Sequence, residues 1–138
     1  PDPSMSECGA PHREVCPRLR PRTNTPLQPL VTLNGDGYVE AAQALARRIA
    51  AVEGDTAAKA RYGFRLCLSR PPGEKELAIY TSLYERALAK YTQNNDLAMK
   101  MAAGPLAAPP EGANVAELAA WTVVGSTLLN MDEMFLKR

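Results

Sequence analysis

From residue 34 to the end of the chain, apolar residues recur at steps of three and four positions, whereas residues 1–33 show almost no periodicity. Steps of three and four place apolar side chains on one face of an α-helix that lies on a core. No stretch alternates between apolar and polar residues for long enough to indicate a β-strand. The pattern predicts an all-α fold, a small bundle of four main helices over residues 34–138, preceded by an extended, Pro-rich N-terminal lead-in over residues 1–33.

The first two predicted helices span about residues 37–52 and 55–68. Gly54 ends the first helix, and Asp55 is suited to accept hydrogen bonds from the free backbone amides that begin the second. Pro71 disfavours helical backbone at the residue before it, so the second helix ends there. The apolar stripe of the first helix consists of Val39, Ala42, Leu45, Ala46, Ile49 and Val52. Gln43, Arg47 and Arg48 are expected to face away from the core.

The third predicted helix follows the Pro-Pro-Gly turn at residues 71–73, and Glu76 is placed to reach back and cap its start. Its tyrosine-rich stripe is typical of the edge of a core, because a tyrosine combines an apolar ring with a hydroxyl group that prefers water. We expect this helix to continue past Asn94 to Met101. The stripe consists of Leu77, Tyr80, Thr81, Tyr84, Leu88 and Tyr91.

The fourth predicted helix starts at Asn114 and carries the most regular apolar stripe of the chain, and Glu117 completes an Asn-x-x-Glu capping arrangement. Trp121 is expected to be the central core residue, because a single Trp buries a large area. The acidic pair Asp132 and Glu133 is expected to be solvated. The stripe consists of Leu118, Trp121, Val124, Leu128, Met131 and Phe135.

The segment TLNGDGYVEAAQ (residues 32–43) contains the middle of a calcium-loop pattern. A calcium loop needs a carboxylate at its first position and a bidentate Glu at its twelfth, and these positions hold Thr32 and Gln43. No helix is expected before this segment, because two prolines crowd that side. The segment is therefore predicted to be the start of a helix, with Asn34 or Asp36 as its capping residue.

The lead-in is proline-dense, and only a short helical turn is expected, around residues 27–33. Its apolar group is expected to pack on the helices, whereas residues 1–14 are expected to need the preceding part of a longer protein to become ordered. This apolar group consists of Leu27, Leu30, Val31 and Leu33.

The composition is that of an ordinary globular domain, with 46% hydrophobic residues, 22% charged residues and a net charge of +1. A net charge this close to zero creates no overall electrostatic field that would attract nucleic acid or a membrane surface.

The longest apolar stretch, residues 118–129, falls short of the ~20 residues that cross a bilayer, so no transmembrane segment is expected. The basic residues of the lead-in have no aromatic residues between them, so nucleic-acid binding by base stacking is not expected. They are Arg13, Arg18, Arg20 and Arg22.

Cys8, His12 and Cys16 offer sulfur and imidazole ligands at even four-residue spacing. A structural zinc site normally has four ligands, and the sequence contains no Cys-x-x-Cys pair. We therefore expect no metal, while zinc on these three residues, or a disulfide between the two cysteines, stays open as an alternative. The segment also lacks the Cys-x-x-Cys-His pattern of c-type haem attachment, so no cofactor is expected here.

Three segments resemble a known family: REVCPRLRPRTNTPLQPLVTLN (13–34), RYGFRLCLSRPPGEKEL (61–77) and AWTVVGSTLLNMDEMFLKR (120–138). Together they are similar to the C-terminal part of the planctomycete-type domain of unknown function (fifteen fifty-three) family. Pro29 stands where the family pattern Arg-x-Asn-Thr-Pro-Leu-Gln-Ala-Leu-x-x-Leu-Asn has Ala. The matching residues are Arg22, Asn24, Thr25, Pro26, Leu27, Gln28, Leu30, Leu33 and Asn34.

The resemblance implies a larger secreted or cell-envelope protein, in which this chain follows a second domain of unknown function and often a cytochrome-c-like domain. Any haem would then belong to the upstream region, and the expected partners are the N-terminal domains of the same protein. The family has no assigned activity, so the resemblance supplies no catalytic residues. Because the chain begins at Pro1 rather than Met, we interpret it as a piece whose upstream part is missing.

Two interpretations of function stay open. In the first, the chain is a non-catalytic structural or interaction domain, and Arg22, Asn24 and Gln28 dock on the missing part. In the second, the chain is one wall of an enzyme or redox module, for polysaccharide use or electron transfer, and these three side chains face the substrate. The favoured alternative to a substrate-facing role is that the three side chains hold the Pro-rich loop through hydrogen bonds to its backbone. The sequence contains no Gly-rich phosphate loop, and an enzyme confined to this segment is not expected.

Overall fold

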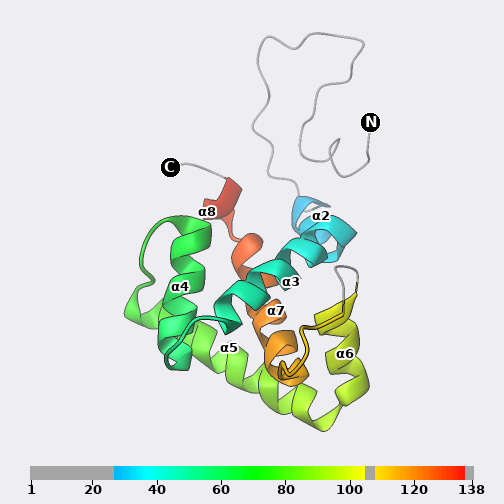
Figure 1. The fold of residues 1–138 in the computed structure, drawn as a ribbon. Helices are drawn as coiled ribbons and strands as arrows, with labels where there is room; N and C mark the ends of the chain where they lie inside the picture. Colours follow the sequence, from blue (N-terminus) through cyan, green and yellow to red (C-terminus); the bar gives the residue numbers. More distant parts are fainter. Residues whose placement is uncertain (1–26, 105–107, 136–138) are drawn as a thin grey trace, which may run out of the picture.

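The computed structural model of the chain describes residues 27–104 and 108–135. All regular structure in these ranges is α-helical, and the helices pack together in one bundle (Figure 1), which confirms the predicted all-α class. The four predicted main helices correspond to α3, α4, α5 and α7. In chain order the helices are α2 (Leu27–Asn34), α3 (Asp36–Ala50), α4 (Thr56–Leu68), α5 (Glu74–Gln93), α6 (Asn95–Ala103), α7 (Val115–Leu129) and α8 (Asp132–Phe135). None of the described helices is both long and apolar enough to cross a membrane.

The central helix is α7, which packs against α3, α5 and α6 and runs through the middle of the bundle in Figure 1. Trp121 on α7 is completely buried, which confirms its prediction as the central core residue. The side chains of Phe64, Ile49 and Leu128 surround the same core and are also fully buried. Because burial of apolar surface is the main stabilising term in folding, this cluster accounts for the position of α7 at the centre.

Small residues allow α3 and α7 to approach each other closely. A Cβ atom added to Gly125 would lie 3.1 Å from the backbone oxygen of Ala42. Ala42 is fully buried, as is nearly all of Ala46 one turn further along α3. The glycine is therefore required for the close contact between the two backbones.

The starts of α4, α5 and α7 follow the predicted capping chemistry. The side chain of Asp55 accepts a hydrogen bond from the backbone amide of Ala58 at 2.8 Å. The Glu76 carboxylate reaches back to the backbone amide of Gly73 at 2.7 Å, as its spacing predicts. Asn114 accepts hydrogen bonds from the first-turn amides of α7.

Two helices end earlier than predicted. Asn94 leaves the helical conformation with φ −138° and ψ 90°, so α5 stops at Gln93 and the expected continuous helix to Met101 is wrong. The Asn94 side chain instead caps α6 by accepting from the amide of Leu97 at 3.2 Å. Similarly, Asn130 separates α7 from α8, and its side chain is engaged by the Thr32 hydroxyl of α2.

The segment 32–43 is helical on both sides of Gly35, so the expectation that no helix precedes it is wrong. The short helical turn expected around residues 27–33 is present, as α2. A proline is tolerated at the third position of α2, because first-turn amides have no acceptor within a helix. The predicted capping by Asn34 or Asp36 is also wrong. Gly35 is the N-cap residue of α3 and forms no side-chain cap, while the Asn34 amide donates to the carbonyl oxygen of Leu30 at 2.8 Å.

The apolar group of α2 packs differently from the prediction. Leu30 and Leu33 are 58% and 44% exposed, so their expected packing on the helices is wrong. Among the described side chains of α2, the buried one is Thr32, which is 5% exposed and donates a hydrogen bond to the side-chain oxygen of Asn130. A polar contact therefore attaches α2 to the end of α7.

Candidate functional site

Most of the predicted site residues lie outside the part of the chain that the structure describes. These are Cys8, His12, Cys16, Arg22 and Asn24. Gln28 lies on α2, within the described backbone. Among the described residues, no group of three or more His, Cys, Asp or Glu side chains is arranged to hold a metal ion. The structure therefore leaves the predicted polar site untested.

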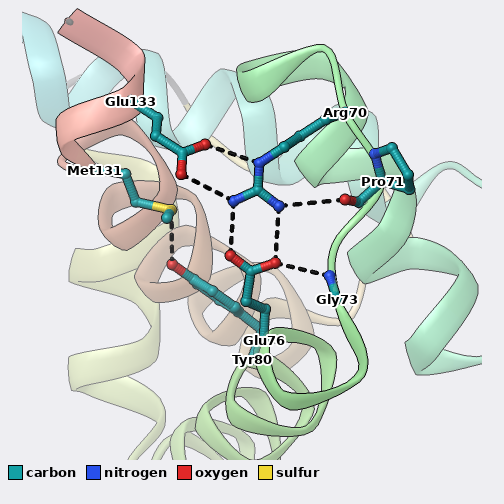
Figure 2. Close-up of polar contacts among 7 residues, drawn as sticks. All are labelled: Arg70, Pro71, Gly73, Glu76, Tyr80, Met131 and Glu133. Atoms are coloured by element: carbon teal, nitrogen blue, oxygen red, sulfur yellow. Dashed lines mark hydrogen bonds and ion pairs between the residues drawn. The ribbon is translucent and has the colours of Figure 1, made fainter. Parts of the chain in front are cut away.

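The most concentrated polar cluster is at the corner between α4 and α5, centred on Arg70 (Figure 2). Ser69 ends α4 in the left-handed conformation with φ 57° and turns the chain away from the helix axis. Arg70 then forms a two-point contact with the Glu76 carboxylate, with nitrogen–oxygen distances of 2.7 and 2.8 Å. Such paired, charge-assisted hydrogen bonds fix the orientation of both side chains.

A second carboxylate shares the same guanidinium group. Glu133 of α8 accepts from the Nε of Arg70 at 2.8 Å and from a terminal nitrogen at 3.1 Å. The other terminal nitrogen also donates to the backbone oxygen of Pro71 at 3.3 Å. Glu133 is 43% exposed, yet it is not merely solvated as predicted, because it joins α8 to a corner 63 residues earlier in the chain.

The protonation states of the cluster follow from these contacts. The hydrogen bonds from Arg70 and, to a lesser degree, from the Gly73 amide lower the pKa of Glu76 to about 2. The hydrogen bonds to Glu76 and Glu133 raise the pKa of Arg70 above its usual value. A general acid or base at neutral pH needs a pKa near 7, and both shifts move away from that value. The cluster is suited to holding helices together and not to proton transfer.

Aromatic rings lie directly beneath the cluster. The guanidinium carbon of Arg70 lies 5.8 Å from the ring centroid of Phe64, and Phe64 contacts Tyr80 edge-to-face with centroids 4.9 Å apart. The Tyr80 hydroxyl donates to the sulfur of Met131 at 3.2 Å (Figure 2). Burial raises the pKa of Tyr80, so this hydroxyl group stays protonated and remains a donor. Arg70 therefore closes one end of the hydrophobic core.

Another polar feature is an open hollow of about 270 Å³ between the end of α3 and the start of α7. Arg47 and Glu117 contribute its charged side chains. The Glu117 carboxylate also pairs with Lys59 at 2.9 Å, and a terminal nitrogen of Arg47 donates to the backbone oxygen of Ala108 at 3.2 Å. Both charges are thus committed to contacts within the protein, and the remaining lining is mainly small and apolar.

The expectation that Gln43 faces away from the core is wrong, because its side chain is a buried polar anchor. It is 1% exposed, and its side-chain amide donates to the backbone oxygens of Met101, at 2.9 Å, and of Gly104. These contacts tie α3 to the C-terminal end of α6. The position of Gln43 on the same helical face as Ala42 and Ala46 was the available signal, since a polar residue on an apolar face needs a partner.

A family model described as "Protein of unknown function (DUF1553)" matches residues 1–84. The chain belongs to this family. The matched range includes Arg70, Glu76 and Tyr80, whereas Met131 and Glu133, which they hold, lie beyond it. No curated protein and no solved structure matches the chain.

Proposed function

We propose that this family member is a non-catalytic helical interaction domain that forms the C-terminal part of a larger secreted or cell-envelope protein. The observation that supports a structural role is the use of polar side chains between helices. Gln43 joins α3 to α6, Thr32 joins α2 to the end of α7, and Arg70 joins the α4–α5 corner to α8. Each contact commits hydrogen-bonding groups to positioning one helix on another.

In this proposal the lead-in docks on the N-terminal domains of the same protein through Arg22, Asn24 and Gln28. Arg, Asn and Gln side chains present several hydrogen-bond donors and acceptors, and these suit recognition of backbone groups on a partner surface. Any haem would belong to a cytochrome-c-like domain upstream. The docking role of the lead-in and the upstream position of the haem domain are both based on the resemblance of the motif from Arg22 to Asn34. The family description assigns no function that would supply them.

The test is reconstitution of the complex from two pieces. The chain would be titrated with the separately produced N-terminal part of the protein, and the heat of binding measured. We expect a one-to-one complex that is weakened at least roughly tenfold by Ala at Arg22, Asn24 or Gln28, as for residues at the centre of an interface. Arg61→Ala, at an exposed position of α4, is the matched control and should bind like the parent.

The competing function gives a different result. If the three side chains face a substrate, their Ala variants would bind the N-terminal part normally but lose turnover in the reconstituted protein. Absence of any complex between the two pieces would contradict the proposed docking role directly.

A further inference from the structure

We propose that residues 131–134 form a latch that opens from the α4–α5 corner while the rest of the bundle, including the Thr32–Asn130 contact, stays folded. The C-terminal latch, as we name this segment, contains Met131, which precedes α8, and the first three residues of α8. The inference concerns the chain's own conformational equilibrium and does not depend on the proposed interaction role. The latch would control access to the aromatic end of the core.

The polar contacts described here between the latch and the α4–α5 corner lie near the surface and are individually weak. Helix α8 spans only Asp132–Phe135, and a helix of one turn is not stable by itself in water. The Arg70–Glu133 ion pair has side chains that are 35% and 43% exposed, so solvent and salt screen it. The Tyr80–Met131 hydrogen bond uses a thioether sulfur, which is a weak acceptor.

The open state retains its own set of satisfied contacts. When Glu133 leaves, Arg70 keeps its two-point contact with Glu76, and water can solvate the freed donors. The fully buried core residues Trp121 and Leu128 belong to α7 before the latch begins. Opening would therefore remove neither the central helix nor the Glu76 charge partner of Arg70.

Cys67 provides a built-in probe of the open state. It lies in the last turn of α4, is partly buried, and packs on the same core cluster as Met131. Burial raises the pKa of the Cys67 thiol, which lowers its reactivity in the closed state. Departure of Met131 from this cluster would bring water and reagent closer to the thiol.

The experiment measures the rate at which a disulfide reagent labels Cys67 in the full chain, with Cys8 and Cys16 replaced by Ser. Glu133→Gln removes the charge that Arg70 binds, and we expect it to raise the rate roughly two- to fivefold, as for loss of an exposed ion pair. Glu85→Gln, at an exposed position of α5, is the control and should leave the rate unchanged. Raising the salt concentration should speed labelling of the parent and have little effect on Glu133→Gln.

The dependence of labelling on urea distinguishes local opening from global unfolding. A latch exposes little surface, so the labelling rate at low urea should be nearly independent of urea concentration. Equal rates for Glu133→Gln and Glu85→Gln would overturn the proposal. A urea dependence as steep as that of global unfolding would do the same, because Cys67 would then react only from the unfolded chain.

Discussion

Tyr84 and Trp121 stack with their ring centroids 4.3 Å apart and their planes inclined by 29°. The pair joins the middle of α5 to the middle of α7, and Trp121 is completely buried. Burial, with a smaller effect of the nearby Glu117 carboxylate, raises the pKa of Tyr84 to about 12. The centre of the bundle is thus a buried aromatic contact between α5 and α7.

Truncation of Trp121 should be the most damaging single change in this core. Trp121→Ala leaves a large cavity and removes the stacking partner of Tyr84, so we expect a loss of about 3–5 kcal/mol in the free energy of unfolding. Because small domains have about 5–15 kcal/mol in total, this variant should be marginally folded. Urea unfolding monitored by circular dichroism measures the loss.

Two comparisons sharpen this prediction. Trp121→Phe should cost less than Trp121→Ala, because it keeps an aromatic ring and the indole nitrogen has no hydrogen-bond partner among the described residues. Leu97→Ala, at a position 42% exposed on α6, should change stability little. A Trp121→Ala protein as stable as Leu97→Ala would place the tryptophan outside the core.

The close contact of α3 with α7 predicts opposite effects for two helical glycines. Gly125→Ala brings a Cβ atom to 3.1 Å from the backbone oxygen of Ala42, and a backbone atom cannot easily move aside. We expect a loss of about 1–3 kcal/mol, as for overpacking. Gly37→Ala in α3 meets nothing within 4 Å and should stabilise the protein by about 0.5–1 kcal/mol through helix propensity. Stabilisation by both substitutions would show that α3 and α7 are further apart.

The sequence predicted the parts of this fold that depend on local pattern. Apolar stripes located α3, α4, α5 and α7, and the spacing of Glu76 from the Pro-Pro-Gly turn predicted its capping contact. The breaks at Asn94 and Asn130 were missed, because the side chain of each asparagine has a hydrogen-bond partner that competes with the helical arrangement and that the apolar pattern does not reveal. For Asn130 this partner is Thr32, which is 98 residues away in the chain.

The candidate site also contains one contact that the local sequence predicts and others that it does not. The contact between Arg70 and Glu76 spans six residues and lies within one turn and the start of one helix. The contact with Glu133 depends on where α8 lies on the folded bundle, and no local pattern encodes that position. Buried Gln43 was missed because its acceptors are backbone oxygens at the end of another helix, and backbone groups leave no signature in a sequence.

Replacement of Gln43 should loosen α6 from α3. Gln43→Leu keeps the side-chain volume approximately but leaves the carbonyl oxygens of Met101 and Gly104 without this donor. An unsatisfied buried polar group costs about 1–3 kcal/mol, and we expect a loss of that size. Hydrogen exchange should show the largest loss of protection in α6. Gln93→Leu, at an exposed position of α5, is the control and should leave the exchange of α6 unchanged.

The Arg70 cluster predicts a loss of stability in acid. The folded-state pKa of Glu76 is about 2, below the usual value of 4.5, so the ionised carboxylate stabilises the folded protein. This contribution is complete above about pH 4.5 and is lost as the pH falls toward 2. Carbon-detected NMR titration of the Glu76 carboxyl group should give a midpoint near 2, and Glu76→Gln should flatten the dependence of stability on pH in this window. Glu74→Gln, on the same helical turn, is the matched control. A Glu76 midpoint near 4.5 would show that Arg70 does not hold this carboxylate in solution.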